Sequence, residues 1–230
     1  ILVGLVVWEW APGRQVNISA ATSPAARRSF YRPLLDQLTT RQSGPIRAEV
    51  VPARNHWEAA SLAPQISLAR GWERQLDLAR NALFYRPGAL TVASYQQWLT
   101  HNGVGWVALP TTPLDYAGKA EAVLLRSGTL PNLQLAWQSP QWQLWQVFGS
   151  PGILSGPGQL TALGPDHLTM YAGRPASFTI RVHPQPYWRV TSGAACVATT
   201  GDGWTELRVT RAGVVTLSAA LGYYHAANCP

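Results

Sequence analysis

Residues 92–110, VASYQQWLTHNGVGWVALP, contain a helix signal and a strand signal in direct succession. Apolar side chains recur at helical spacing in the first half of this stretch, at Val92, Tyr95, Trp98 and Leu99. Asn102-Gly103 is a strong helix stop. The continuous apolar run 104–109 then predicts a short strand with both faces covered, as in sheets flanked by helices. A helix that leads directly into such a strand indicates an α/β layer.

Segments on both sides of this stretch continue the alternation. We predict helices over 24–41, 73–82 and 116–126, and strands over 46–51, 133–138 and 141–148. Only Ser139-Pro140 separates the last two strands, so we expect a hairpin and a mixed sheet. Residues 1–150 are therefore assigned to an α/β layer domain. We expect its helices to pack through Leu76, Leu78, Leu83, Ala120, Val123 and Leu124.

The composition and the hydrophobic pattern of the sequence change at Pro151. Gly and Pro become frequent, helical periodicity ends, and short alternating runs take over. These runs predict strands over 160–163, 168–172, 177–182, 187–190, 204–209 and 214–220. We assign residues 151–230 to a small all-β sandwich, either immunoglobulin-like or similar to a carbohydrate-binding module.

Composition limits the function classes. Charged residues make up only 13 % of the chain, which is about half the usual share. One interpretation is that a partner, a membrane or the rest of its own chain covers part of the surface. The alternative is a surface built from neutral polar residues. The net charge of +7 suits anionic lipid head groups or a phosphate-linked substrate. Nucleic acid is not an expected partner, because the chain has no run of basic residues and no nucleic-acid-binding signature.

The cysteines and the N-terminus bear on location. Cys196 and Cys229 are the only cysteines, and they predict one disulfide in an oxidising compartment or, alternatively, two free thiols. The apolar run 1–8 is either the end of a transmembrane helix, with Trp8 and Trp10 at the membrane interface, or a buried first strand.

The densest group of polar and aromatic residues lies between Asn55 and Tyr85. Its candidate ligand-binding residues are His56, Trp57, Glu58, Arg70, Trp72, Glu73, Arg74 and Asp77. Tryptophan stacks on sugar faces, carboxylates bind hydroxyl groups and arginine binds phosphate, so the group predicts a sugar or phosphate pocket. The alternative is a structural ion-pair network on a helix surface. Trp188 is a further candidate, for a carbohydrate face or for core packing.

Several catalytic classes lack their patterns. The five histidines show no metal-ligand spacing, and the sequence contains neither a Gly-x-Ser-x-Gly elbow nor a Gly-rich phosphate loop. We therefore expect no metal, no cofactor and no complete catalytic site. A glycoside hydrolase that uses Glu58 and Glu73 stays open as an alternative, because sequence spacing does not give the separation of two carboxylates.

The order of these elements resembles a known group of proteins. The helix and strand of 95–109, a hairpin over 133–147 and the aromatic pair Tyr187-Trp188 resemble the C-terminal extracytoplasmic region of bacterial polytopic membrane proteins related to GT-C glycosyltransferases. The stretches 56–59 and 70–75 resemble uncharacterised actinobacterial members of that group.

The resemblance implies a non-catalytic domain outside the cytoplasm, anchored by transmembrane segments that precede it, while the catalytic acidic residues lie elsewhere. Its partners would be the membrane-embedded part of its own chain, the membrane surface near the N-terminus, and a cell-wall glycan or a polyprenyl-phosphate sugar. The alternative from another class is a stand-alone secreted carbohydrate- or solute-binding protein.

Overall fold

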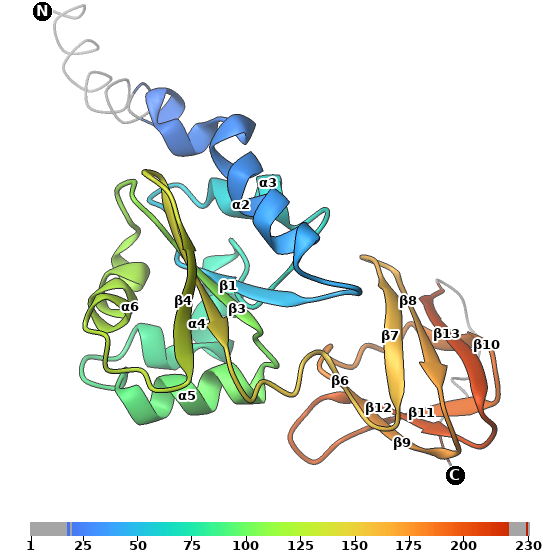
Figure 1. Ribbon diagram of the computed structural model, residues 1–230. Helices are drawn as coiled ribbons and strands as arrows, with labels where there is room; N and C mark the ends of the chain where they lie inside the picture. The colour runs from blue at the N-terminus through green and yellow to red at the C-terminus, as the bar shows by residue number, and fades with distance from the viewer. Residues whose placement is uncertain (1–17, 19, 221–228, 230) are drawn as a thin grey trace, which may run out of the picture.

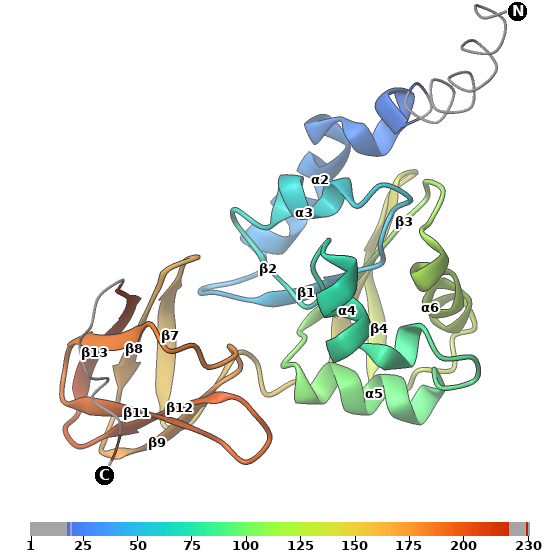
Figure 2. The same ribbon diagram turned by 180° about the vertical axis from the view of Figure 1, so that it is seen from behind.

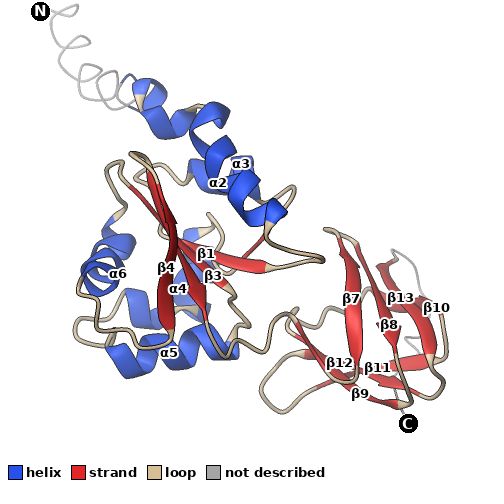
Figure 3. Ribbon diagram, viewed as in Figure 1, coloured by secondary structure: helices blue, strands red, loops and turns tan. Residues whose placement is uncertain are grey.

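A computed structural model describes residues 18, 20–220 and 229, and it places a helix-flanked mixed sheet beside a β-sandwich (Figure 1). Colouring by secondary structure shows that the described helices all belong to the first unit (Figure 3). The fold class predicted from the sequence, a helix-containing mixed sheet followed by all-β structure (α+β overall), is confirmed, with one mixed sheet followed by two antiparallel sheets.

The first unit contains a five-stranded sheet of order β2-β1-β3-β5-β4. In chain order its elements are η1 (Pro24–Ala26), α2 (Arg28–Thr40), β1 (Arg47–Val50), α3 (Trp57–Leu62), β2 (Ser67–Leu68), α4 (Arg74–Arg80), η2 (Ala82–Phe84), α5 (Val92–His101), β3 (Trp106–Pro110), α6 (Tyr116–Arg126), β4 (Leu133–Gln138) and β5 (Trp142–Val147). Strand β1 is parallel to β2 and β3, whereas β5 is antiparallel to β3 and β4. The expected hairpin of β4 and β5 is present.

Both faces of the central strands β1 and β3 are buried under helices, as the continuous apolar run of 104–109 predicted, whereas the edge strand β4 is partly exposed (Figure 2). Ala48 and Val50 of β1 pack with side chains of α2 and α3 on one face. Val107 and Leu109 of β3 face the other side, where η2, α5 and α6 cover them. Trp142 is fully buried in the first core, and its indole N–H donates to the Phe30 carbonyl at 2.8 Å.

The second unit is a sandwich of two four-stranded antiparallel sheets, with orders β10-β13-β8-β7 and β11-β12-β9-β6. Its strands are β6 (Leu154–Ser155), β7 (Gly158–Leu163), β8 (His167–Ala172), β9 (Ala176–Ile180), β10 (Trp188–Ser192), β11 (Ala195–Thr199), β12 (Thr205–Val209) and β13 (Gly213–Ala219). Alternate residues of both sheets, including Met170, Phe178 and Leu217, form one core between them. The sequence patterns had indicated six of these strands, and β6 and β11 were missed.

Some helix faces differ from the prediction. Leu76 and Leu78 are 46 % and 43 % exposed, and only Leu83 of that group packs against the core. The prediction for α6 was wrong for Ala120 and Val123, which are exposed; Leu124 is partly buried. The buried face of α6 instead consists of Ala117, Gly118, Glu121, Ala122 and Leu125. Because Glu121 is buried, the inward face of α6 differs from the face that the apolar residues alone would predict.

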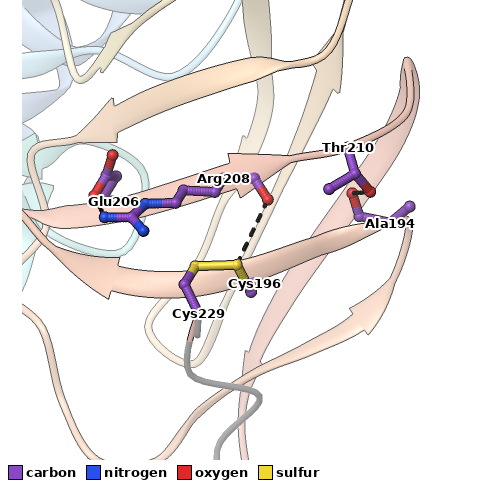
Figure 4. The surroundings of a disulfide bond; sticks show 6 residues. All are labelled: Ala194, Cys196, Glu206, Arg208, Thr210 and Cys229. Carbon is purple, nitrogen blue, oxygen red and sulfur yellow. Dashed lines mark hydrogen bonds and ion pairs between the residues drawn. A yellow bond between two sulfur atoms is a disulfide. The ribbon is translucent and has the colours of Figure 1, made fainter.

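The predicted disulfide is present. Cys196 in β11 is bonded to Cys229, 33 residues further along the chain (Figure 4). The backbone N–H of Cys229 also donates to the carbonyl of Val197 at 3.2 Å. Strand β11 is the last strand on its side of the sheet, so this bond ties the C-terminal segment to a sheet edge.

The N-terminal apolar run 1–8 lies outside the described residues, so both interpretations of it stay predictions. Within the ranges that are described, no helix combines the length and the apolar character that crossing a bilayer requires.

Candidate functional site

A large hollow, called the first groove below, lies between the two units and has a volume of about 1090 Å³. One wall comes from the α/β unit, over β2 and the segment around α3, and the other comes from residues 163–165 and Val182 of the sandwich. Trp57 and Trp72 line it with side chains that are 40 % and 69 % exposed. Two exposed indole rings at an interdomain groove provide flat apolar surfaces to a ligand.

A second groove, of about 660 Å³, continues from the first. The two share lining residues at the interdomain junction, among them Arg47, Gly71 and Val182. The second groove extends to the end of α5, which contributes His101, and to Arg181 and Trp204 of the sandwich. A ligand longer than one sugar ring is therefore able to occupy both grooves.

A polar cluster lies beside the first groove, where the loops that follow parallel strands β1 and β3 meet. The backbone N–H of Arg54 donates to Pro113, and that of Asp115 donates to Pro52, so the two loops are held together. His56 follows β1 and occupies the left-handed region with φ of 52°, which is unusual for a residue other than glycine. The carboxyl ends of parallel strands are a common ligand position in α/β sheets, and backbone strain clusters at such sites.

The side chains of this cluster contact one another, although one carboxylate oxygen of Glu58 is buried without a hydrogen bond among the described residues. Arg74 donates to both oxygens of Asp115 at 2.9 Å, a bidentate pair, and lies over the Tyr116 ring at 4.7 Å. The His56 ring lies between Glu58, with Nδ1 at 3.3 Å, and Arg74, with Nε2 at 3.1 Å. Burial opposes the charge on Asp115, but the hydrogen bonds from Arg74 and the Ala117 N–H, together with the charges of Arg74 and His56, outweigh it and lower the pKa of that carboxyl. Both ring nitrogens of His56 are thus occupied by protein groups.

A second polar cluster is buried under the helices on the far face of the sheet. The Arg70 guanidinium lies 3.5 Å from Glu49, 3.7 Å from Asp77 and 3.7 Å from Glu121, and its centre is 3.9 Å from the Phe84 ring. Three carboxylates surround one cation there. Burial raises the pKa of Glu49 well above its usual range, and the neighbouring Glu121 adds to the shift. Charge on Arg70 is also opposed by burial, but these carboxylates outweigh it and raise its pKa.

The structure brings some sequence-predicted residues together and separates others. His56, Trp57, Arg70 and Trp72 line the first groove. Glu73, Asp77 and Trp188 line the second groove, where Trp188 is only 4 % exposed and belongs to the sandwich core. Glu58 and Arg74 line neither groove and belong to the His56 cluster.

The structural network that was the alternative interpretation is present in part. Asp77 lies close to Arg70, and Arg74 pairs with Asp115 rather than with Glu73 or Asp77. The Arg70–Asp77 pair is buried, and the Arg74–Asp115 pair joins segments that are distant in sequence. Neither pair lies along an exposed helix face.

Several groups at these sites were not found from the sequence. Glu49, Asp115 and Glu121 are single carboxylates in different elements, and Arg181 and Trp204 come from the other unit. The one available signal was the position of Glu49, a carboxylate between the apolar residues Ala48 and Val50 of a strand. No three His, Cys, Asp or Glu side chains in the described part of the chain are arranged to hold a metal ion.

Comparison of the chain with protein-family models, curated proteins and solved structures gives no match in any of the three. The functional inference therefore depends on the geometry of the grooves.

Proposed function

We propose that this chain is a non-catalytic extracytoplasmic domain of a membrane glycosyltransferase-like protein, and that its first groove binds a cell-envelope glycan or the sugar of a lipid-linked glycan. The observation that carries the proposal is the pair of exposed tryptophans, Trp57 and Trp72, at a groove of about 1090 Å³ between the units. Sugar rings have apolar faces that stack on indole, and clefts between domains are frequent ligand sites.

The polar groups near the groove support binding rather than chemistry. Among the described residues, His56 is the one imidazole that lines the first groove, and protein partners lie beside both of its nitrogens. A general base needs a nitrogen that is able to reach a substrate proton. The position of His56 is better suited to holding the loop that carries Trp57.

The glycoside hydrolase alternative has less support. Glu58 is buried and contacts His56, whereas Glu73 is exposed and lines the second groove. Such enzymes need two carboxyl groups that face the same glycosidic bond. These two glutamates do not share a cavity.

The location is supported by the disulfide between Cys196 and Cys229, because such bonds persist mainly in oxidising compartments. Mass spectrometry of the protein isolated from its native envelope should show this bond intact, and free thiols there would contradict the proposed location. Fractionation of the same cells separates the anchored domain, found with membranes, from a stand-alone secreted binding protein, found in the soluble fraction.

Titration with soluble oligosaccharides released from bacterial cell wall tests the groove. We expect Trp72→Ala to weaken binding by at least about tenfold, which corresponds to the loss of about 1.4 kcal/mol. Tyr171→Ala is the matched control, since Tyr171 is half-exposed on β8 and lines neither groove. Equal affinities of wild type and Trp72→Ala, or no binding by either, would refute sugar binding in the first groove.

A further inference from the structure

The second groove contains arginines that have no carboxylate partner. Arg47 donates to the Ser67 hydroxyl at 3.2 Å and to the Asn102 carbonyl at 2.9 Å. Arg181 donates to the carbonyls of His101 and Gly152 and to the Ser155 hydroxyl, at 3.2, 3.0 and 2.8 Å. All five acceptors are neutral. Neither arginine lies within ion-pair distance of an acidic side chain among the described residues.

Other cationic and titratable groups surround these two arginines. Arg80 at the end of α4 and the imidazoles of His101 and His183 line the same groove. The charges affect one another: burial and then the field of Arg181 lower the pKa of Arg47 to about 10. Burial, Arg80, Arg47 and His101 together lower the pKa of His183, against a backbone hydrogen bond that raises it.

The acidic residues of the groove do not balance this charge. Asp77 is held by the Asn81 amide at 2.8 Å, by the Tyr85 hydroxyl and by nearby Arg70. Glu73 is exposed, and it is the other carboxylate that lines the described groove. Asp202 does not line the groove. Its negative charge stabilises the charged form of Arg181, and its carboxylate accepts a hydrogen bond from the Thr200 hydroxyl. Three arginines therefore face one unoccupied carboxylate.

Two buried indole N–H groups give an independent indication. Trp188 and Trp204 both line the second groove, at 4 % and 3 % exposure. The Nε1 atom of each is buried and has no hydrogen-bond acceptor among the described residues. The Trp204 ring also lies 4.7 Å from that of His183 and 5.1 Å from that of His101. Buried donors almost always have acceptors, so these two leave unused hydrogen-bonding capacity in the wall of the second groove.

We propose that the second groove binds the phosphate group of a phosphate ester through Arg47, Arg80 and Arg181, beside the indole N–H groups of Trp188 and Trp204 in the groove wall. A phosphate carries negative charge and several acceptor oxygens, which complement a groove with three arginines and one unoccupied carboxylate. The groove wall combines groups from both units, so a bound phosphate also joins α5 to the sandwich.

This inference goes beyond sugar binding and does not depend on it, because different residues carry it. The two grooves are continuous, however, so a sugar phosphate would place its sugar ring towards Trp72 and its phosphate towards Arg181. A phosphate of this kind is found in soluble glycosyl phosphates and in lipid head groups, and the experiment separates these sources.

The test uses isotope-labelled protein with its disulfide intact and follows the indole N–H signals by NMR. Trp188→Phe and Trp204→Phe assign the two signals of the groove. The probes are inorganic phosphate, glucose 1-phosphate, glucose, and vesicles of phosphatidylcholine with or without phosphatidic acid. We expect inorganic phosphate and glucose 1-phosphate to shift both indole signals in a saturable manner, and glucose to leave them unchanged. Binding that is seen only with phosphatidic acid vesicles would assign the phosphate to a lipid head group.

Charge variants give the control. Arg80 is exposed at the end of its helix, so Arg80→Gln should fold normally and weaken phosphate binding several-fold. Arg181→Gln removes a guanidinium of the groove wall and should weaken binding by about tenfold or more. Arg126→Gln removes the same charge from exposed Arg126 on α6, outside the groove, and should leave the affinity unchanged.

Two results would overturn the proposal. One is the absence of any shift with all phosphate probes. The other is an equal loss of affinity in Arg126→Gln and Arg80→Gln, which would assign binding to net charge alone. The experiment is separate from the sugar test, because Trp72→Ala should retain the binding of inorganic phosphate.

Discussion

Glu49→Gln should make the protein more resistant to alkaline conditions than the wild type. Glu49 is fully buried in β1, and neither carboxylate oxygen has a hydrogen bond among the described residues. Arg70 lies 3.5 Å from it and also lies close to Asp77 and Glu121. One guanidinium neutralises only one of three carboxylates, so a proton retained on Glu49 relieves the excess of negative charge.

The sign and size of the effect follow from linkage. Burial, reinforced by Glu121 and opposed by Arg70, raises the pKa of Glu49 in the folded protein well above its usual value of 4.5. The native state therefore binds more protons than the unfolded chain above pH 4.5. The stabilising contribution is fully present below that pH and is lost as pH rises, by up to about 1.4 kcal/mol per pH unit, until the folded-state pKa is passed. Glutamine does not titrate, so the variant lacks this loss.

Urea unfolding at a series of pH values measures the difference. Ellipticity at 222 nm follows the α/β unit, because the described helices lie there. The unfolding free energy of Glu49→Gln minus that of the wild type should increase steadily above pH 4.5 and then level off. Asp36→Asn, which removes an exposed carboxylate from α2, serves as the control and should follow the wild type. A difference that is constant with pH would refute the retained proton.

Three further changes probe the rest of the fold. Replacing Cys196 and Cys229 by serine should destabilise the sandwich by about 2–4 kcal/mol, because the bond closes a long loop; a melting temperature unaffected by reducing agent would contradict this. Trp142→Phe should cost about 2–4 kcal/mol through the lost Phe30 hydrogen bond and the cavity left in the first core, measured by urea midpoint; no change would mean that the core repacks without loss. Gly103→Ala should lower the melting temperature by several degrees, since φ is +64° and a methyl group would meet the Gly152 carbonyl; an unchanged melt would show that the junction yields freely.

The sequence was most informative where local signals and packing agree. Helix α5 begins after Thr91, whose hydroxyl accepts from the Ser94 N–H, and ends at Asn102-Gly103 as predicted. Apolar periodicity failed for α6, because it treats Glu121 as an exposed residue although the buried Arg70 cluster encloses it. Strand β11, which contains Cys196, was missed because Ala-Cys-Val-Ala-Thr carries little apolar bulk.

The two grooves also differ in how well the sequence predicted their residues. The segment around Trp57 and Trp72 was found because its aromatic and charged residues are close in sequence. The second groove was not found, since Arg47, Arg181 and Trp204 become neighbours only when the two units come together. The sequence of one chain shows where residue types are concentrated locally. It does not show which distant segments come together in the fold.

The bond at Cys229 has a consequence for behaviour at high concentration. An outermost strand normally presents unpaired amide and carbonyl groups, which neighbouring molecules are able to extend into a continuous ladder. In this chain Cys229 is bonded to Cys196 of β11, and its backbone N–H donates to the Val197 carbonyl at this edge. The disulfide therefore protects the edge strand β11 from pairing with strands of other molecules. Reduced protein should self-associate at concentrations where the oxidised form stays monomeric.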